Sequence, residues 1–449
     1  MHTSLTTRTR RGALAAVGLA VAATVTLTAC APPGSGGTSD ASSDAATEVS
    51  TDLGTDPVEL VLYDGAGLKT IDDALIAAFT KEHPNVTITT RFDPDDVQAQ
   101  NAPRVLAADD APDIARVVAL GDIVSSGLLT NLDPWADAYG WTDLPEGQLA
   151  MYRVDENGVR GSGSQYTLAS GFVTTGLYVN TDLMAQLGID APPTTIEEWE
   201  ADLATAKAAG VTPILAGNQT GQGVTTLQFL LNNYLGAQAV NDWVFNVADA
   251  SIDTPDGVQA VQTVSDWIAA GYFNDDANGT DNAGAMARFV AGEGLFYPSG
   301  NWDAKNIGGQ MDDVVFVSPP ALEAGDLLAM SDPVSNFGIP AKSEHKDAAA
   351  AFLNFLVSDE ARAILVENGF APSGSGDAPA TEAGSLNESV QSAFAALVEA
   401  DGQVQFVQNA TNGITQTWNA ESQNLFGGKT TPEALLTSVQ SSYEEELGR

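Results

Sequence analysis

Residues 58–92 read VELVLYDGAGLKTIDDALIAAFTKEHPNVTITTRF, and this stretch indicates the fold of the body. Its first six residues, Val58–Tyr63, are typical of a β-strand. Apolar residues then recur at helical spacing over Ile71–Lys81, and Val86–Phe92 alternates as a strand does. A strand, a helix and a second strand within about 35 residues form a βαβ unit, which predicts a parallel sheet and a right-handed crossover.

The same alternation of patterns continues along the chain. Helical patterns cover residues 195–209, 225–235, 255–270, 346–368 and 432–447. Short apolar runs predict strands at residues 176–179, 212–216, 294–297 and 314–317. No repeat of about 20 to 50 residues recurs, which argues against a solenoid. We therefore expect an α/β protein with two doubly wound lobes, whose ligand binds beyond the carboxyl ends of the strands.

The start of the chain is typical of a signal peptide. Arg8, Arg10 and Arg11 precede an apolar run over Gly12–Leu27, which is shorter than the ~20 residues of a membrane-spanning helix. The run ends in Leu-Thr-Ala-Cys30, which resembles the bacterial lipobox and implies cleavage after residue 29 and acylation of Cys30. The alternatives for this lone cysteine are a free thiol and an intermolecular disulfide. The export route, general secretory or twin-arginine, stays open.

Composition separates a tether from a globular body. Residues 30–56 are rich in Gly, Ser, Thr, Asp and Pro, so we expect a flexible, lipid-anchored tether. About 390 residues follow, enough for two lobes, and we expect them to form a monomer. The net charge is −41 and the 18 Lys and Arg residues are scattered, which argues against nucleic acid and against anionic ligands. We interpret the acidity as a solvated surface and expect no cofactor.

Six short segments carry a family resemblance. In chain order they are APDI at 111–114, GLYVNTDL at 176–183, GIDAPPTTIEEW at 188–199, FVAGEG at 289–294 leading to GNW at 300–302, FGIP at 337–340 and GFAP at 369–372. Together they resemble the extracellular solute-binding proteins of family 1, the sugar-binding components of ABC importers that include maltose-binding protein. The resemblance covers nearly the whole body.

The resemblance implies a periplasmic-binding-protein fold of type II. The expected first lobe comprises residues 57–172 and 317–357, and the expected second lobe comprises residues 173–316 and 358–449. The lobes would close like a hinge around strands near Phe172–Gly176 and Phe316–Pro319. Capture of a carbohydrate, with an oligosaccharide favoured, and delivery to ABC importer permease subunits are the implied function. Which sugar is bound cannot be read from the sequence, because specificity depends on loop geometry.

Two tryptophans are candidates for stacking on the C–H face of a sugar. Trp302 follows Gly300 and Asn301 after a predicted strand, and its position resembles that of a sugar-stacking tryptophan in related binders. Trp418 lies in the C-terminal region, where related proteins often place a second aromatic residue. Burial in the core is the alternative for both. We expect the other tryptophans, Trp135, Trp141, Trp199, Trp243 and Trp267, to pack in the interior.

The remaining candidate ligand contacts are polar, aromatic or backbone groups on predicted loops. Tyr63 and Asp64 end the first strand before Gly65-Ala-Gly67, where the backbone could approach a ligand closely. Asp113 stands at a strand entry and either binds a hydroxyl group or caps a turn. The others, which face the ligand in the family, are Gly171, Phe172, Gln219, Asp303 and Asp332. Ordinary loop chemistry is the alternative for each of them.

Other classes of protein are less well supported. A lipid-anchored glycosidase needs two placed carboxyl groups, but no motif singles out a pair among the 59 acidic residues. The three histidines show no catalytic arrangement, and clusters of histidine or cysteine for a metal are lacking. Asn274, Asp276 and Asn278 begin like a calcium loop, but Ala285 stands where its last ligand is required. We therefore expect no enzyme and no metal; a surface-binding module without a transport partner stays possible.

Overall fold

The computed structural model describes residues 49–374, 379–411 and 413–449. The chain divides after Ala46, and residues Thr47–Arg449 form one compact unit. The predicted signal peptide, Cys30 and the predicted tether up to residue 48 lie outside the described residues. Among the described residues, no helix combines the length and the apolar character that crossing a membrane requires.

The βαβ unit predicted from residues 58–92 is present. Strand β1 (Val58–Gly65), helix α1 (Lys69–Glu82) and strand β2 (Val86–Asp93) follow one another, and β1 pairs with β2 in parallel, with Val58 opposite Val86. Leu60 and Leu62 of β1 are fully buried, and α1 buries Leu75 and Phe79 against the same core. The apolar spacing in the sequence therefore marks the buried faces of these elements.

Ten of the twelve strands in the described residues form one sheet of mixed direction, and β4 and β5 form a separate two-stranded antiparallel sheet. The order of the large sheet is β2-β1-β3-β10-β6-β8-β7, with β9 and β11 also paired to β6 and β12 paired to β10. The parallel pairing that we predicted holds for β1 with β2 and β3 and for β7 with β8, whereas β6 and β10 pair antiparallel. The remaining bounds are β3 (Ile114–Arg116), β4 (Arg153–Val154), β5 (Ser164–Gln165), β6 (Thr167–Asn180), β7 (Thr212–Ile214), β8 (Gly294–Gly300), β9 (Val314–Val317), β10 (Ala329–Gly338), β11 (Ala371–Pro372) and β12 (Gln403–Val404).

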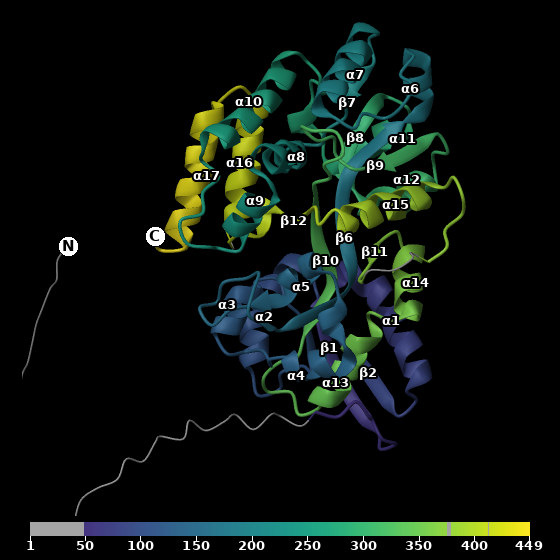
Figure 1. Ribbon diagram of the computed structural model, residues 1–449, viewed down its shortest axis with the longest axis vertical. Coiled ribbons are helices and arrows are strands. Elements are labelled where there is room, and N and C mark those ends of the chain that lie inside the picture. The colour runs from purple at the N-terminus through teal and green to yellow at the C-terminus, as the bar shows by residue number, and fades with distance from the viewer. Residues whose placement is uncertain (1–48, 375–378, 412) are drawn as a thin grey trace, which may run out of the picture. The chain divides into compact units, whose positions relative to one another are not determined.

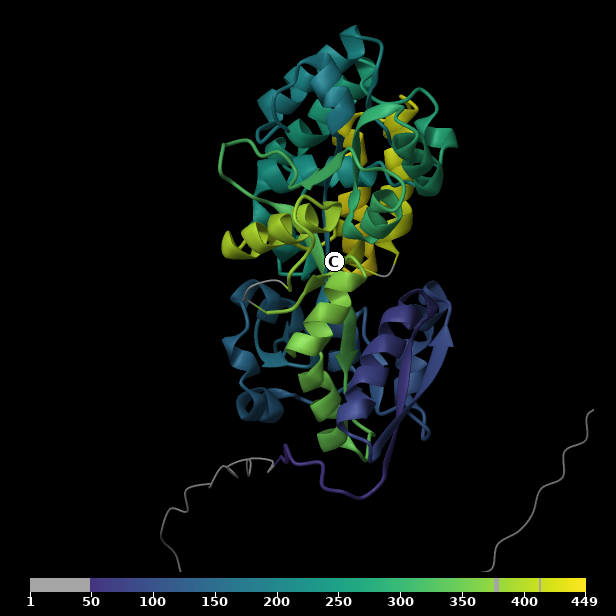
Figure 2. The same cartoon turned by 90° about the vertical axis from the view of Figure 1, so that its right-hand side faces the viewer.

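Helices surround the sheet in two groups, which Figures 1 and 2 show as a lower and an upper lobe. The first lobe surrounds the core cluster that includes Leu60 and Phe352, and the second surrounds the cluster that includes Leu203 and Trp243. Besides α1, the first lobe contains α2 (Asp95–Ala107), α3 (Leu120–Ser125), α4 (Asp133–Tyr139), α5 (Glu146–Tyr152), α13 (Lys346–Phe355) and α14 (Asp359–Glu367), with the short 3-10 helices η1 (Ala66–Leu68) and η2 (Trp141–Asp143).

The second lobe contains most of the remaining helices. They are α6 (Thr181–Leu187), α7 (Ile196–Ala208), α8 (Val224–Leu235), α9 (Ala237–Val244), α10 (Pro255–Ala269), α11 (Asn282–Val290), α12 (Ala304–Gly308), α16 (Ile414–Phe426) and α17 (Pro432–Glu446), with η3 (Ala277–Gly279), η4 (Asn301–Asp303) and η5 (Val407–Asn409). The family segment at 188–199 is structural: Gly188 ends α6 in the left-handed conformation, and Thr195 forms a capping box with Glu198 at the start of α7.

Two long strands cross between the lobes. Strand β6 runs from the first core, where Leu168 is buried, to the second, where Leu177 and Val179 are buried, and β10 returns beside it. Our prediction that the second crossing lies near Phe316–Pro319 is wrong, because β9 pairs with the second-lobe half of β6. An apolar run identifies a strand but not its partner, and β10 contains Asp332, Pro333 and Asn336, which hide it from the strand pattern.

Helix α15 (Leu386–Glu399) lies at the junction of the lobes (Figure 1) and packs on the cores of both sides. Leu386 and Val390 join a cluster with Tyr178 and Phe316, whereas Phe394 and Leu397 join the first-lobe core.

The single helix predicted over 346–368 is two helices, α13 and α14. The Ser358 hydroxyl accepts a hydrogen bond from the amide of Ala361 and so caps the start of α14.

The lobe boundaries that we expected stay a prediction, and two described segments bear on them. Ala361 and Leu365 of α14 are buried in the first-lobe core, although the division at residue 358 assigned them to the second lobe. Val49 and Leu53, from the segment assigned to the tether, pack against the first core, and the amide of Ser50 donates to Asp347 at 3.2 Å.

Candidate binding site

A tight turn after β8 presents the indole ring of Trp302. Its neighbours are buried and bonded: Asp303 Oδ2 accepts hydrogen bonds from Tyr297 (2.9 Å) and Ser299 (2.6 Å), and Asn301 Oδ1 accepts one from the amide of Thr174 (3.1 Å). Trp302 itself is 37% exposed. Thus η4 anchors the backbone on both sides of an exposed aromatic ring.

Gly300 is required for this position of the ring. A β-carbon at Gly300 would overlap the six-membered ring of Trp302, so the indole lies directly against the backbone of the preceding glycine. The centroid of the Trp302 ring also lies 6.4 Å from that of Phe406, at an interplanar angle of 44°. Two aromatic rings therefore line the same part of the second lobe.

The carboxyl group of Asp332 lies at the junction, on the crossing strand β10. Its Oδ2 accepts a hydrogen bond from the side-chain amide of Asn409, whereas its Oδ1 has no hydrogen-bond partner among the described residues. Burial raises the pKa of Asp332 to about 6, and Arg160 and Asn409 oppose that rise. A buried acceptor without a partner is uncommon, so Oδ1 marks an unsatisfied polar position at the junction.

A second polar group lies at the carboxyl end of β1 in the first lobe. Asp64 and Asp72 are both buried, Arg116 Nη1 lies 3.5 Å from Asp64 Oδ1, and the Ser335 hydroxyl donates to Asp72 Oδ1 at 3.0 Å. Burial, and then the charge of Asp64, raise the pKa of Asp72 well above its usual range. Asp72 therefore keeps its proton to a higher pH than a free carboxyl group.

Three exposed apolar side chains follow strand ends that point toward the junction. Among the described residues, the large hydrophobic residues that are exposed are Val61, Val97, Val118, Trp302 and Leu322. Val97, Val118 and Trp302 follow the carboxyl ends of β2, β3 and β8, which point toward the crossing strands. The junction thus combines apolar surface with a few placed polar groups, as small-molecule sites do.

Several predicted contact residues have partners within the protein. The Tyr63 hydroxyl donates to Asp93 Oδ2 at 2.7 Å, and burial and this contact raise the pKa of Tyr63 to about 12. Asp113 accepts hydrogen bonds from the Val61 amide (3.0 Å) and the Ser343 hydroxyl (2.7 Å), which favours its turn-capping role. Asp303 holds the Trp302 turn, as described above. Their ligand roles stay predictions.

The other predicted residues lie in three different environments. Trp418 is fully buried in α16, with its ring centroid 6.3 Å from that of Trp243, which favours the packing role. Phe172 is buried and stacks on Phe394 at 5.8 Å, and a β-carbon at Gly171 would overlap the carbonyl oxygen of Ala371. Gln219 is exposed on the loop between β7 and α8. The five tryptophans expected to pack are all buried.

Sequence reasoning missed four residues that the structure brings to the junction: Arg116, Arg160, Phe406 and Asn409. Arg116 ends β3 two residues after the APDI segment, so its position at a strand end was a usable signal. Phe406 and Asn409 belong to a segment for which we predicted neither a strand nor a helix. Only the pairing of β12 with β10 brings this segment to the site.

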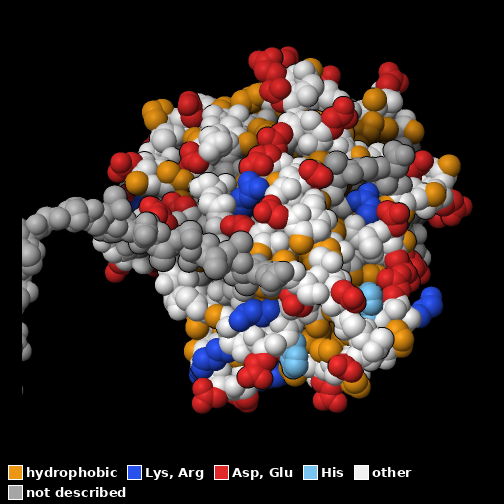
Figure 3. All heavy atoms as spheres, turned by 60° about the horizontal axis from the view of Figure 1, so that its bottom comes forward, with side chains coloured by type: hydrophobic (Ala, Val, Ile, Leu, Met, Phe, Trp, Pro, Cys, Tyr) orange, Lys and Arg blue, Asp and Glu red, His pale blue; other side chains and the backbone are white. Residues whose placement is uncertain are grey.

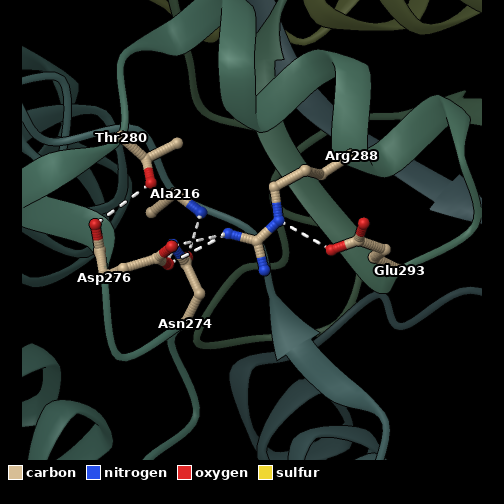
Figure 4. Close-up of polar contacts among 6 residues, drawn as sticks. All are labelled: Ala216, Asn274, Asp276, Thr280, Arg288 and Glu293. Atoms are coloured by element: carbon tan, nitrogen blue, oxygen red, sulfur yellow. Dashed lines mark hydrogen bonds and ion pairs between the residues drawn. The ribbon is translucent and has the colours of Figure 1, made fainter.

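In the loop that resembled the start of a calcium site, the carboxylate of Asp276 is paired with Arg288 (Figure 4). Arg288 Nη1 lies 2.9 Å from Asp276 Oδ1 and its Nε lies 2.7 Å from Glu293 Oε2, while Asn274 Oδ1 accepts from the amide of Ala216 at 2.8 Å. Hydrogen bonds from Asn274 and Arg288 lower the pKa of Asp276. No group of three or more metal-ligating side chains occurs within the described residues.

A surface cavity of about 570 Å³ lies elsewhere, lined by Val49, Trp135 and residues 343–348. Asp347 in its wall already accepts hydrogen bonds from Trp135 and Ser50, so we interpret this cavity as the place where the start of the compact unit packs on the first lobe.

Figure 3 shows acidic side chains spread over one face, with the basic ones scattered among them. That face therefore offers no basic stripe for phosphates.

The raised pKa of Asp332 predicts how stability depends on pH. A carboxyl group whose pKa is higher in the folded than in the unfolded state stabilises the fold at low pH, and this contribution is lost as pH rises from about 4 to about 6. Asp332→Asn has no such group. Urea unfolding at pH 4.5 and pH 7.5 should show the variant gaining about 2 kcal/mol on the parent at the higher pH. Equal pH dependence of both proteins would contradict this.

Comparison with known proteins defines the class. Residues 65–363 match the family model of the bacterial extracellular solute-binding proteins, so the chain belongs to this family. It is a solute-binding protein rather than an enzyme, as we predicted. A comparison with curated protein sequences finds no match.

Solved structures share the fold over nearly their whole length. A chitin oligosaccharide binding protein is 21% identical, with a TM-score of 0.69 over 88% of this chain and 100% of the other. Maltose-bound MalE3 of T. maritima is 17% identical, with a TM-score of 0.67 over 86% and 99%. Lmo0181 of Listeria monocytogenes, an ABC substrate-binding protein in complex with cycloalternan, is 17% identical, with a TM-score of 0.67 over 88% and 100%. The predicted type II fold is confirmed.

Proposed function

We propose that this protein is an extracellular, lipid-anchored receptor that captures a carbohydrate between its lobes and delivers it to an ABC importer. The observation that carries the proposal is the exposed Trp302, whose neighbours on both sides are bonded into the protein. A pyranose presents an apolar C–H face and a rim of hydroxyl groups. Trp302 and Phe406 supply rings for the face, and Asp332 Oδ1, which is buried and unpaired here, would supply an acceptor for the rim once lobe motion exposes it.

Two further observations support this proposal. Three structurally similar proteins bind carbohydrates: one binds a chitin oligosaccharide, one is bound to maltose and one is in complex with cycloalternan. The Leu-Thr-Ala-Cys30 segment supports lipid anchoring, and a tether ahead of the compact unit would let the receptor reach a membrane permease. An oligosaccharide is favoured over a monosaccharide, since exposed apolar residues follow three strand ends.

A thermal-shift screen tests the carbohydrate assignment. The chain with Cys30→Ser is melted with mono- and oligosaccharides, and with polyols, amino acids and calcium as controls. A ligand that binds only the folded state raises the midpoint by mass action, so the screen presupposes no particular chemistry. We expect one sugar series to raise the midpoint and to be recovered chemically unchanged. Cleavage of the sugar would indicate a glycosidase, and a shift with controls alone would refute carbohydrate binding.

A further inference from the structure

The loop between β4 and β5 of the first lobe, residues 155–163, is a hydrogen-bonded turn that carries Arg160 and Gly161. Asp155 Oδ1 accepts hydrogen bonds from the amides of Asn157 and Val159, both at 2.8 Å. Gly161 and Gly163 adopt φ values of 99° and 88°, which few other residues tolerate. The loop therefore holds the backbone at Arg160 in one conformation.

Arg160 leaves its own lobe and contacts the second. Its Nη2 donates to Gln405 Oε1 at 3.0 Å, and its guanidinium carbon lies 4.9 Å from the centroid of the Phe245 ring. Backbone contact adds to this, because a β-carbon on Gly161 would lie 2.9 Å from Cδ2 of Phe245. One side chain thus makes a hydrogen bond and a cation–π contact across the junction.

The partners of Arg160, Phe245 and Gln405, are held in the second lobe by packing and by hydrogen bonds. Phe245 belongs to its hydrophobic core, and the carbonyl of Gln405 accepts from Gln228 at 2.6 Å while its amide donates to Asn241 at 2.8 Å. On the crossing strand, the charge of Asp332 favours the charged form of Arg160, whose pKa burial lowers. Any separation of the lobes at this point must break the contacts of Arg160.

We propose that Arg160 is an interlobe latch, which docks the first lobe onto Phe245 and Gln405 of the second and so sets how far the lobes separate when no ligand is bound. The latch is a property of the two-lobe architecture and does not depend on which ligand the protein binds. Removing the guanidinium while keeping an unbranched apolar side chain, as in Arg160→Met, should release it.

The test measures the distance between the lobes in the absence of ligand. Cys30 is the lone cysteine, so Cys30→Ser leaves a chain into which Glu82→Cys in α1 and Ala208→Cys in α7, both exposed, introduce one spin label per lobe. Pulsed electron paramagnetic resonance then gives the distance distribution. We expect Arg160→Met to lower the ratio of docked to separated molecules about tenfold, the change that about 1.4 kcal/mol produces.

Arg153→Met is the matched control, because Arg153 lies in the same hairpin but pairs with Glu146 of its own lobe at 2.9 Å. It should leave the distribution unchanged. Arg160→Lys keeps the charge near Asp332 but loses the planar group, so we expect an intermediate shift even if Arg160→Met fails to fold. Distributions of folded Arg160 variants that match the parent would overturn the latch, and a shift in Arg153→Met of equal size would do so too.

Discussion

Trp302→Ala is expected to weaken sugar binding by about 30-fold to 1000-fold, which corresponds to the loss of about 2 to 4 kcal/mol typical of a central aromatic contact. The thermal midpoint of the ligand-free protein should barely change. The reason is that the indole is 37% exposed and that Asn301 and Asp303, rather than Trp302, make the hydrogen bonds of the turn. Isothermal titration calorimetry with the sugar identified in the screen measures the first effect, and differential scanning calorimetry measures the second.

Trp302→Phe is the control for this experiment. Phenylalanine keeps an aromatic face at the same position, next to Phe406, so it should retain a large part of the affinity that alanine loses. If Trp302→Ala instead bound the sugar normally and unfolded at a clearly lower temperature, Trp302 would be a structural residue. The carbohydrate site would then have to be sought elsewhere on the protein.

Trp418→Ala is expected to have the largest effect on stability, a loss of about 3 to 5 kcal/mol in the free energy of unfolding. The whole indole is buried in the second-lobe core beside Trp243, so its removal leaves a cavity that the packed helices α16 and α17 cannot fill. Urea unfolding followed by circular dichroism measures this loss. Binding measured well below the transition midpoint should keep an affinity close to that of the parent.

Two comparisons make this result specific. Trp418→Phe should lose much less stability, because a ring still fills most of the space and Trp418 Nε1 has no hydrogen-bond partner among the described residues. Trp302→Ala removes the same number of atoms from a partly exposed position and should leave unfolding almost unchanged. A Trp418→Ala protein with parental stability and no sugar binding would show that Trp418 contacts the ligand.

Much of the local structure could be predicted, because it depends on contacts between residues close in the chain. The βαβ unit at 58–92 and the helices near 196–208 and 255–269 follow from apolar spacing. The prediction was wrong at 346–368, where Ser358 divides one helical pattern into two helices. It was also wrong about the second crossing strand, which is β10.

The candidate site could be predicted only in part. Trp302 was identifiable since glycine and asparagine before it indicate a turn after a strand, and the structure places it exposed at the junction. The same reasoning could not distinguish Trp302 from Trp418, because a sequence does not show whether an aromatic ring finds space in a core. Arg160 and Phe406 were missed because their partners lie far along the chain, 245 residues apart in the case of Arg160 and Gln405.

The sequence by itself determined the class of the fold, the order of its elements, the family and the acidic character of the body. These depend on composition, on spacing within about 20 residues and on short motifs, all of which a linear chain displays. Only the tertiary structure decided which strands cross between the lobes, which tryptophan is exposed and which arginine joins the two lobes. These depend on pairing between distant segments, and on burial that exists only once the two cores have formed.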